Sequence, residues 1–149
     1  MAPKKQDVHP MLDGVAEQIR PRVSEKGQTL QVENTDCKAC FDRKWTMEAI
    51  YNIVDNAVKY TPEGGRINIK AMTYELFVRI DITDSGIGIQ EDETGKIFGR
   101  FYRGRQVQEQ EGVGIGLYLA REILTEEGGY IKVQSKKGAG TTFSVFLSV

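Results

Sequence analysis

The sequence has little of what zinc, disulfide and membrane proteins depend on. It contains one histidine, His9, and two cysteines, Cys37 and Cys40, that form a single Cys-x-x-Cys pair. Two thiolates without a nearby histidine or second pair do not complete a tetrahedral zinc site, so we expect reduced cysteines in a turn or edge strand. No apolar run approaches the roughly 18 residues that span a bilayer, and the N-terminus lacks the apolar core of a signal peptide. We therefore expect a cytoplasmic domain without membrane contact of its own.

An excess of charge of one sign is also missing. Lys and Arg number 20 against 21 Asp and Glu, which gives a net charge of -1 and a pI near 5.9. This balance gives no general attraction to nucleic acid, so a bound anion has to be held by a local site. Hydrophobic residues make up 40% of the 149 residues and charged residues 28%, which predicts one globular domain with a real core.

The pattern of apolar residues predicts three helices and six short strands. The helices are expected over residues 12–26, 44–60 and 113–127, and the strands over 29–32, 38–41, 66–72, 76–82, 130–135 and 141–147. Gly27 ends the first helix, which contains the helix-kinking residue Pro21, and Asp42 is placed to cap the second. This order predicts an α+β fold, a two-layer sandwich in which about three helices cover one face of a mixed, mostly antiparallel sheet of about five strands. Residues 1–10 are expected to be a flexible N-terminal stretch, and residues 11–149 to form the domain.

The helix predicted over residues 44–60 carries two asparagines four residues apart. At about 100° per residue, its aliphatic side chains gather on one side, and Glu48, Asn52, Asp55, Asn56 and Lys59 gather on the other. Such a polar side is usually just solvated. It can also serve a phosphate ligand, because a carboxamide oxygen is a hard ligand for Mg²⁺ and a lysine supplies a positive charge.

Two later segments are rich in glycine. In the stretch 84–89, Gly86 and Gly88 let the backbone approach a flat ligand beside Asp84, whose carboxylate can accept a hydrogen bond from an exocyclic amino group. In the stretch 111–117, glycines lead into a helix whose free N–H groups suit phosphates. Neither a dinucleotide fingerprint nor a Walker loop is present, so these segments indicate some other nucleotide site.

Taken in order, these segments resemble one family, the catalytic and ATP-binding domain of sensor histidine kinases. That family lies in the ATPase superfamily that includes DNA gyrase and a heat-shock chaperone. The segment 52–62 is similar to its N box, 84–89 to its first glycine box, 98–103 to its F box, 112–117 to its second glycine box, and 128–135 with 138–143 to its last two strands.

The resemblance implies a site for ATP and Mg²⁺. Asn56 would give its side-chain oxygen to Mg²⁺, and Asn52, one turn earlier, would face the triphosphate or metal-bound water. Lys59 would offset phosphate charge, and Tyr60 would lie near the base or sugar. Asn52, Asn56 and Lys59, together with Arg103, are the implied catalytic residues.

The adenine would bind on the other side of this site. Asp84 would recognise the adenine amino group, while Gly86 and Gly88 would let the loop that ends at Ile89 approach the ring. Thr141 is a weaker assignment, to the water network on the base side.

A stretch from about residue 97 to 116 would be a mobile ATP lid. The lid residues with an implied role are Arg103 and Arg100, which would reach phosphates, and Gly112, Gly114 and Gly116, which would close on them. Leu117, directly after the lid, is also assigned to the ATP site. Phe98, Phe101 and Tyr102 either contribute to the ATP site or are packing that anchors the lid.

The implied activity is transfer of the ATP γ-phosphoryl group to a histidine. Relatives that hydrolyse ATP carry a glutamate at the position of Asn52, and an amide is no general base, which favours transfer over hydrolysis. An ATPase or serine kinase of the same superfamily, and a non-catalytic interaction module, remain as alternatives.

The phosphoacceptor is expected on another domain. His9 precedes Pro10, whereas the family's acceptor usually precedes an acidic residue in a long dimerisation helix, so His9 is interpreted as a bystander. The implied partners are therefore a separate dimerisation and histidine-phosphoacceptor domain and, downstream, a response regulator. The isolated domain is expected to be a monomer, and its parent a membrane-anchored sensor kinase in a two-component system.

Overall fold

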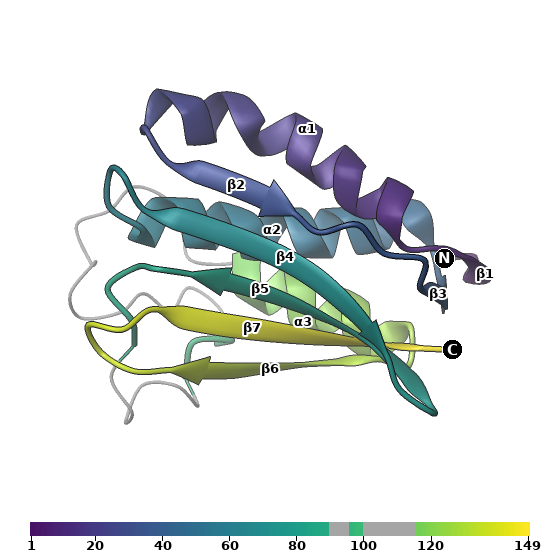
Figure 1. Cartoon of the computed structure of the whole chain (residues 1–149). Coiled ribbons are helices and arrows are strands. Elements are labelled where there is room, and N and C mark those ends of the chain that lie inside the picture. The colour runs from purple at the N-terminus through teal and green to yellow at the C-terminus, as the bar shows by residue number, and fades with distance from the viewer. Residues whose placement is uncertain (90–95, 100–115) are drawn as a thin grey trace.

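The computed structural model describes residues 1–89, 96–99 and 116–149, and it confirms the predicted α+β sandwich (Figure 1). Along the chain, its elements are β1 (Lys4–Asp7), α1 (His9–Glu25), β2 (Thr29–Val32), β3 (Lys38–Phe41), α2 (Arg43–Tyr60), β4 (Arg66–Thr73), β5 (Phe77–Asp84), α3 (Gly116–Glu126), β6 (Tyr130–Ser135) and β7 (Thr141–Ser148). Among these residues, no helix combines the length and the apolar character needed to cross a membrane.

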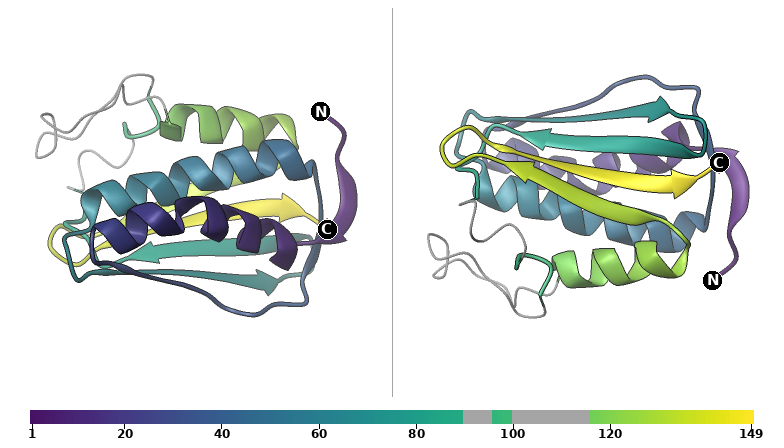
Figure 2. Two further views of the ribbon diagram at one scale, coloured as in Figure 1. Left: turned by 90° about the horizontal axis from the view of Figure 1, so that it is seen from above. Right: turned by 90° about the horizontal axis from the view of Figure 1, so that it is seen from below.

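The main sheet has five strands in the order β2-β4-β5-β7-β6. Strand β2 pairs with β4 in parallel, and the other neighbours pair antiparallel, as predicted for a mixed, mostly antiparallel sheet. The three helices lie side by side on one face of this sheet, with α2 between α1 and α3 (Figure 2). The opposite face of the sheet carries no helix of the described chain.

Alternation along the strands explains why one face is covered. In β5, Val78, Ile80 and Ile82 are fully buried, whereas Thr83 on the opposite face is exposed. Side chains alternate between the two faces of a strand, so the buried set all point at the helices. The aliphatic side of α2, with Ile53 at its centre, is equally buried and meets them.

The N-terminal residues differ from the prediction of a flexible stretch over residues 1–10. Strand β1 pairs antiparallel with β3 in a separate two-stranded sheet, and helix α1 already begins at His9. Val8 between them is fully buried, and its N–H donates to the carbonyl of Cys37 at 3.0 Å. Ladder hydrogen bonds and a buried anchor therefore order this segment. Helix α1 is continuous through Pro21.

Side chains from other elements satisfy both ends of α2. At its start, the Asp42 side chain accepts from the N–H of Trp45 at 3.1 Å, as predicted for a cap. At its end, the Lys26 ammonium donates to the carbonyls of Val58 and Lys59 at 2.8 and 2.9 Å. These contacts fix α2, the helix with the two asparagines, against the rest of the fold.

Glu127, directly after α3, also holds the start of α2. Its carboxylate accepts from the backbone N–H of Asp42 at 2.7 Å and from the fully buried Thr46 hydroxyl at 2.6 Å. Replacing Glu127 with alanine leaves both donors without this acceptor, so we expect a loss of about 2 to 3 kcal/mol in the free energy of unfolding, measured with urea. Glu126→Ala, at an exposed neighbouring position, should change it by less than about 0.5 kcal/mol. Equal effects of the two changes would contradict this role.

Candidate functional site

From Asn52 to Lys59, the polar side of α2 is half-buried in the structure, where a merely solvated helix face would be exposed; Glu48, one turn earlier, is exposed. The Nδ2 atom of Asn52 is buried, and it has no hydrogen-bond partner among the described residues. Gly116, the first residue of α3, lies beside it, since a Cβ atom added to Gly116 would be 3.7 Å from Asn52 Oδ1. A buried amide without a described partner, next to a helix start whose N–H groups point along the helix axis, is an arrangement that suits a phosphate oxygen.

Two cations lie on the same side of α2, held by a carboxylate. The Lys59 ammonium lies 3.4 Å from Oδ2 of Asp55, and the Arg22 guanidinium of α1 contacts Oδ1 of the same residue. Asp55 therefore offsets part of the charge that Lys59 was predicted to offer to phosphates. Asn56, the predicted Mg²⁺ ligand, is half-buried one turn after Asn52.

Asp84 ends β5, and its side chain is 7% exposed. Burial raises the pKa of its carboxyl group, while hydrogen bonds from the backbone N–H groups of Gly86 and Thr141 act in the opposite direction. The bond from Gly86 is 2.8 Å long. A buried carboxylate with few partners of its own is ready to accept a hydrogen bond from a ligand.

The loop after Asp84 passes so close to its neighbours that only glycine fits. A Cβ atom on Gly86 would be 2.5 Å from the carbonyl oxygen of Tyr60, the last residue of α2, and the Ile87 N–H donates to that same oxygen at 3.3 Å. Gly88 has φ +74°, and a Cβ there would collide with the carbonyl of Lys136. These contacts join the predicted adenine loop to the end of the asparagine helix, as the two motifs require.

Ser135, at the end of β6, is a residue that the sequence analysis gave no role. Its hydroxyl accepts from the N–H of Ile89 at 2.7 Å and lies 2.7 Å from the hydroxyl of Thr141. No motif in the sequence marks Ser135. Its position beside Thr141 follows only from the register between β6 and β7.

Phe98 packs into the core. Its side chain is 8% exposed, its ring meets that of Phe143 edge-on at 6.2 Å between centroids, and the Arg121 guanidinium lies 5.6 Å from its centroid. Leu117 packs against the core from the start of α3. Both side chains anchor the ends of the segment predicted to be a lid.

Part of the predicted lid lies outside the described residues. Of the stretch 97–116, the structure describes 97–99 and 116. The predicted residues that lie outside are Arg100, Phe101, Tyr102, Arg103, Gly112 and Gly114.

The residues present fit Mg²⁺ only together with substrate phosphates. Within the described part of the chain, no three His, Cys, Asp or Glu side chains come together as a metal-binding group. Mg²⁺ commonly keeps several waters and binds one or two protein ligands plus substrate phosphates, so a single amide oxygen from Asn56 is consistent with such a site.

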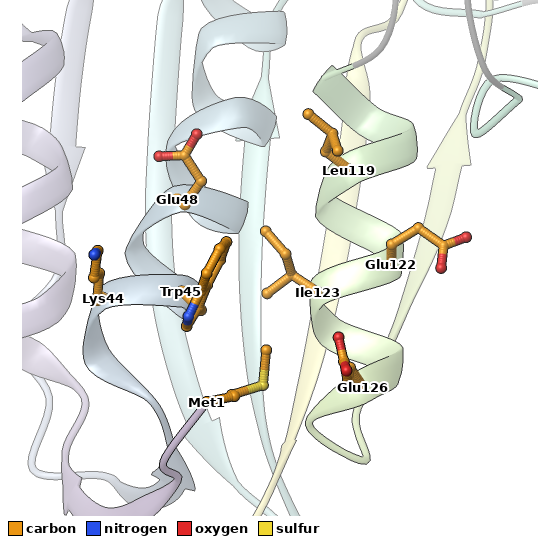
Figure 3. A pocket seen from close by; sticks show the side chains of 8 residues that line it. All are labelled: Met1, Lys44, Trp45, Glu48, Leu119, Glu122, Ile123 and Glu126. Atoms are coloured by element: carbon orange, nitrogen blue, oxygen red, sulfur yellow. The ribbon is translucent and has the colours of Figure 1, made fainter.

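A groove between α2 and α3 shares no lining residue with this site (Figure 3). Its lining residues are Met1, Lys44, Trp45, Glu48, Leu119, Glu122, Ile123 and Glu126. Trp45 of α2 and Ile123 of α3 face each other across it, and the charged lining residues are three glutamates and one lysine. Because this charge repels phosphates, we do not place the nucleotide there.

The raised pKa of Asp84 predicts a pH-dependent cost of folding. The folded protein binds the proton of this carboxyl group more tightly than the unfolded chain does. The group therefore lowers the free energy of unfolding as the pH rises from its unfolded pKa of about 3.8 through its raised pKa in the folded protein. The amide of asparagine in Asp84→Asn does not ionise in this range. We expect the free energy of unfolding of the variant, minus that of the wild type, to grow over this window and then level off, measured with urea at a series of pH values. A difference that falls with rising pH would contradict this.

Comparisons with known proteins agree with this geometry. The family model of histidine kinase-, DNA gyrase B- and HSP90-like ATPases matches residues 41–149. The adaptive-response sensory kinase SasA of Synechococcus sp. strain JA-3-3Ab is 38% identical over 91% of this chain and 37% of its own length. Histidine kinase P4 of Formosa agariphila is 37% identical over 80% of this chain and 9% of its own length. The chain therefore spans less than half of each relative.

Solved structures share the fold. The mycobacterial sensor histidine kinase MprB superposes with a TM-score of 0.89 at 27% identity, over 97% of both chains. Full-length ShkA, in complex with AMPPNP, superposes with a TM-score of 0.84 at 25% identity, over 100% of this chain and 32% of that one.

Proposed function

The chain belongs to the family of histidine kinase-, DNA gyrase B- and HSP90-like ATPases, and on that premise we propose that it binds Mg²⁺–ATP and donates the γ-phosphoryl group to a histidine of a separate domain. The observation that carries this proposal is the buried Nδ2 atom of Asn52, which has no hydrogen-bond partner among the described residues and lies next to the start of α3. It supplies a donor where the phosphates would lie, while Asp84 supplies an acceptor where the adenine would lie.

Phosphoryl transfer requires that the reacting groups are aligned and that the negative charge of the phosphates is neutralised. The transition state of phosphoryl transfer is loose, and its charge is spread over the phosphoryl oxygens. We assign the phosphates to the amide of Asn52, the N–H groups at the start of α3 and the cation of Lys59, with Arg103 as a further cation. None of these is a general base for water, which favours transfer over hydrolysis.

We assign Mg²⁺ to the side-chain oxygen of Asn56; when bound, the ion would neutralise part of the negative charge on the phosphates. We expect Mg²⁺ to strengthen binding of a non-hydrolysable ATP analogue to the wild type about tenfold or more, and to change binding to Asn56→Ala less than about twofold. Calorimetric titrations with Mg²⁺ and with a chelator measure both. Asn68→Ala is the control, because Asn68 is an asparagine of β4 whose amide donates to Glu33 instead, at 2.8 Å. Equal Mg²⁺ dependence in Asn56→Ala and the wild type would contradict the assignment.

The histidine acceptor has to come from elsewhere. His9 lies at the start of α1, 3.1 Å from Asp13, and α1 begins at the end of the sheet opposite the Asp84 turn (Figure 1). We therefore assign the acceptor histidine to a dimerisation and phosphoacceptor domain. We assign a response regulator as the next recipient of the phosphoryl group in a two-component pathway.

Transfer from γ-labelled ATP tests this function. Alone, the chain should remain unlabelled and release almost no phosphate. When the phosphoacceptor domain of a related sensory kinase is added, we expect acid-labile label on that domain, as for phosphohistidine. Rapid labelling of His9 would contradict a separate acceptor, and steady phosphate release without an acceptor would instead support the ATPase alternative.

A further inference from the structure

Three polar side chains form a row across the end of the sheet. Register pairs Asp84 of β5 with Thr141 of β7, and Thr141 with Ser135 of β6. Directly paired residues of antiparallel strands point to the same face, and here that is the face covered by the helices. Thr141 therefore lies between the predicted adenine acceptor and Ser135.

The neighbours of the Ser135 hydroxyl group allow its hydrogen-bond polarity to be assigned. It lies 3.0 Å from the carbonyl oxygen of Gly140, which can only accept, so we assign the single hydroxyl hydrogen of Ser135 to that contact. The N–H of Ile89 donates to Ser135 at 2.7 Å. The remaining contact, 2.7 Å from Thr141 Oγ1, therefore has Thr141 as the donor and Ser135 as the acceptor.

This order fixes what Thr141 can offer a ligand. Its hydroxyl hydrogen is used toward Ser135, so only lone pairs remain free on Oγ1. The neighbouring Asp84 carboxylate is also an acceptor when ionised. Two adjacent acceptors suit an exocyclic amino group, directly or through a water, and they repel a carbonyl oxygen.

We propose that Ser135 is a specificity-determining positioning residue, which keeps Thr141 an acceptor and so makes the site prefer a purine with a 6-amino group over one with a 6-oxo group. The proposal rests on the nucleotide site proposed above. It assigns Ser135 no contact with the nucleotide, because its action passes through Thr141 and through the backbone of Ile89.

The ratio of affinities for non-hydrolysable ATP and GTP analogues tests this proposal. In Ser135→Ala, the Thr141 hydroxyl is free to turn and donate to a 6-oxo group, so we expect the preference for ATP to fall about five- to tenfold. Ser135→Thr keeps the hydroxyl and should keep the preference. Calorimetry with both analogues gives the ratio, and thermal unfolding shows whether each variant is folded.

Ser144→Ala is the matched control. Ser144 is also a serine of this sheet, and its hydroxyl donates to Asp81 at 2.6 Å, but on the face away from the helices. Its loss should lower stability and leave the ratio unchanged. If the ratio falls as far in Ser144→Ala as in Ser135→Ala, the proposal is wrong.

Thr141→Val provides a second route if Ser135→Ala does not fold. It removes the hydroxyl through which Ser135 acts, so it should lower the same ratio, and adding Ser135→Ala to it should lower the ratio no further. An unchanged ratio in folded Ser135→Ala or in Thr141→Val would overturn the role of Ser135 but not the nucleotide site. A wild type that binds both analogues equally would also overturn the proposal, whereas a folded wild type that binds neither would overturn the nucleotide site itself.

Discussion

Asp84→Asn should weaken binding of a Mg²⁺–ATP analogue about ten- to a hundredfold, which corresponds to about 1.5 to 3 kcal/mol for a lost hydrogen bond to a charged acceptor. Asp84 is 7% exposed, and within the described residues its side chain is hydrogen-bonded only by backbone N–H groups. Asparagine keeps one oxygen but removes the charge, and its NH₂ group opposes an adenine amino group. The dissociation constant measured by calorimetry checks this.

Asp81→Asn is the control for that change. Asp81 lies in the same strand and is also buried, but its carboxylate is bound by the Arg79 guanidinium at 2.8 and 3.0 Å on the face away from the helices. Its loss should lower stability and leave the affinity unchanged. If both variants lose affinity equally, the effect comes from the sheet as a whole and not from adenine recognition.

Gly140→Ala should be the most destabilising single substitution in the turn between β6 and β7. Gly140 has φ +88°, and a Cβ atom there would collide with the carbonyl oxygen of Asp84. The left-handed backbone costs about 1 to 2 kcal/mol and overpacking about 1 to 3 kcal/mol, so we expect a loss of about 2 to 5 kcal/mol in the free energy of unfolding. Urea unfolding measures it.

Gly138→Ala separates the two contributions. Gly138 has φ +82° in the same turn, but a Cβ atom there would meet nothing within 4 Å, so only the backbone cost of about 1 to 2 kcal/mol applies. If the two variants were equally stable, the close approach of this turn to Asp84 would not contribute to the free energy of unfolding.

The sequence predicted the elements well where local patterns decide them. The alternation in β4, β5 and β7 and the helical period in α2 are strong signals, and these elements lie within a few residues of their predicted bounds. Strand β1 was missed because Lys4–Asp7 is polar and without an apolar pattern, and its partner, β3, lies more than 30 residues away. Local patterns do not show such pairing.

Some residues of the site could be predicted from sequence motifs, and others only from the fold. Motif resemblance singled out Asn52 and Asp84, and the structure joins their two segments through Tyr60. The i,i+4 spacing of Asp55 and Lys59 already permits their pairing on one helix, whereas the contact of Arg22 with the same carboxylate depends on how α1 packs beside α2. The role of Ser135 requires the register of three strands.

The measurement that tests the central claim most directly is calorimetric titration of the wild-type chain with a non-hydrolysable ATP analogue and Mg²⁺. The account predicts binding of one nucleotide per chain, weakened by a chelator and stronger than binding of the matching GTP analogue. Absence of binding by a chain that circular dichroism shows to be folded would contradict the nucleotide site, and with it the proposed kinase function.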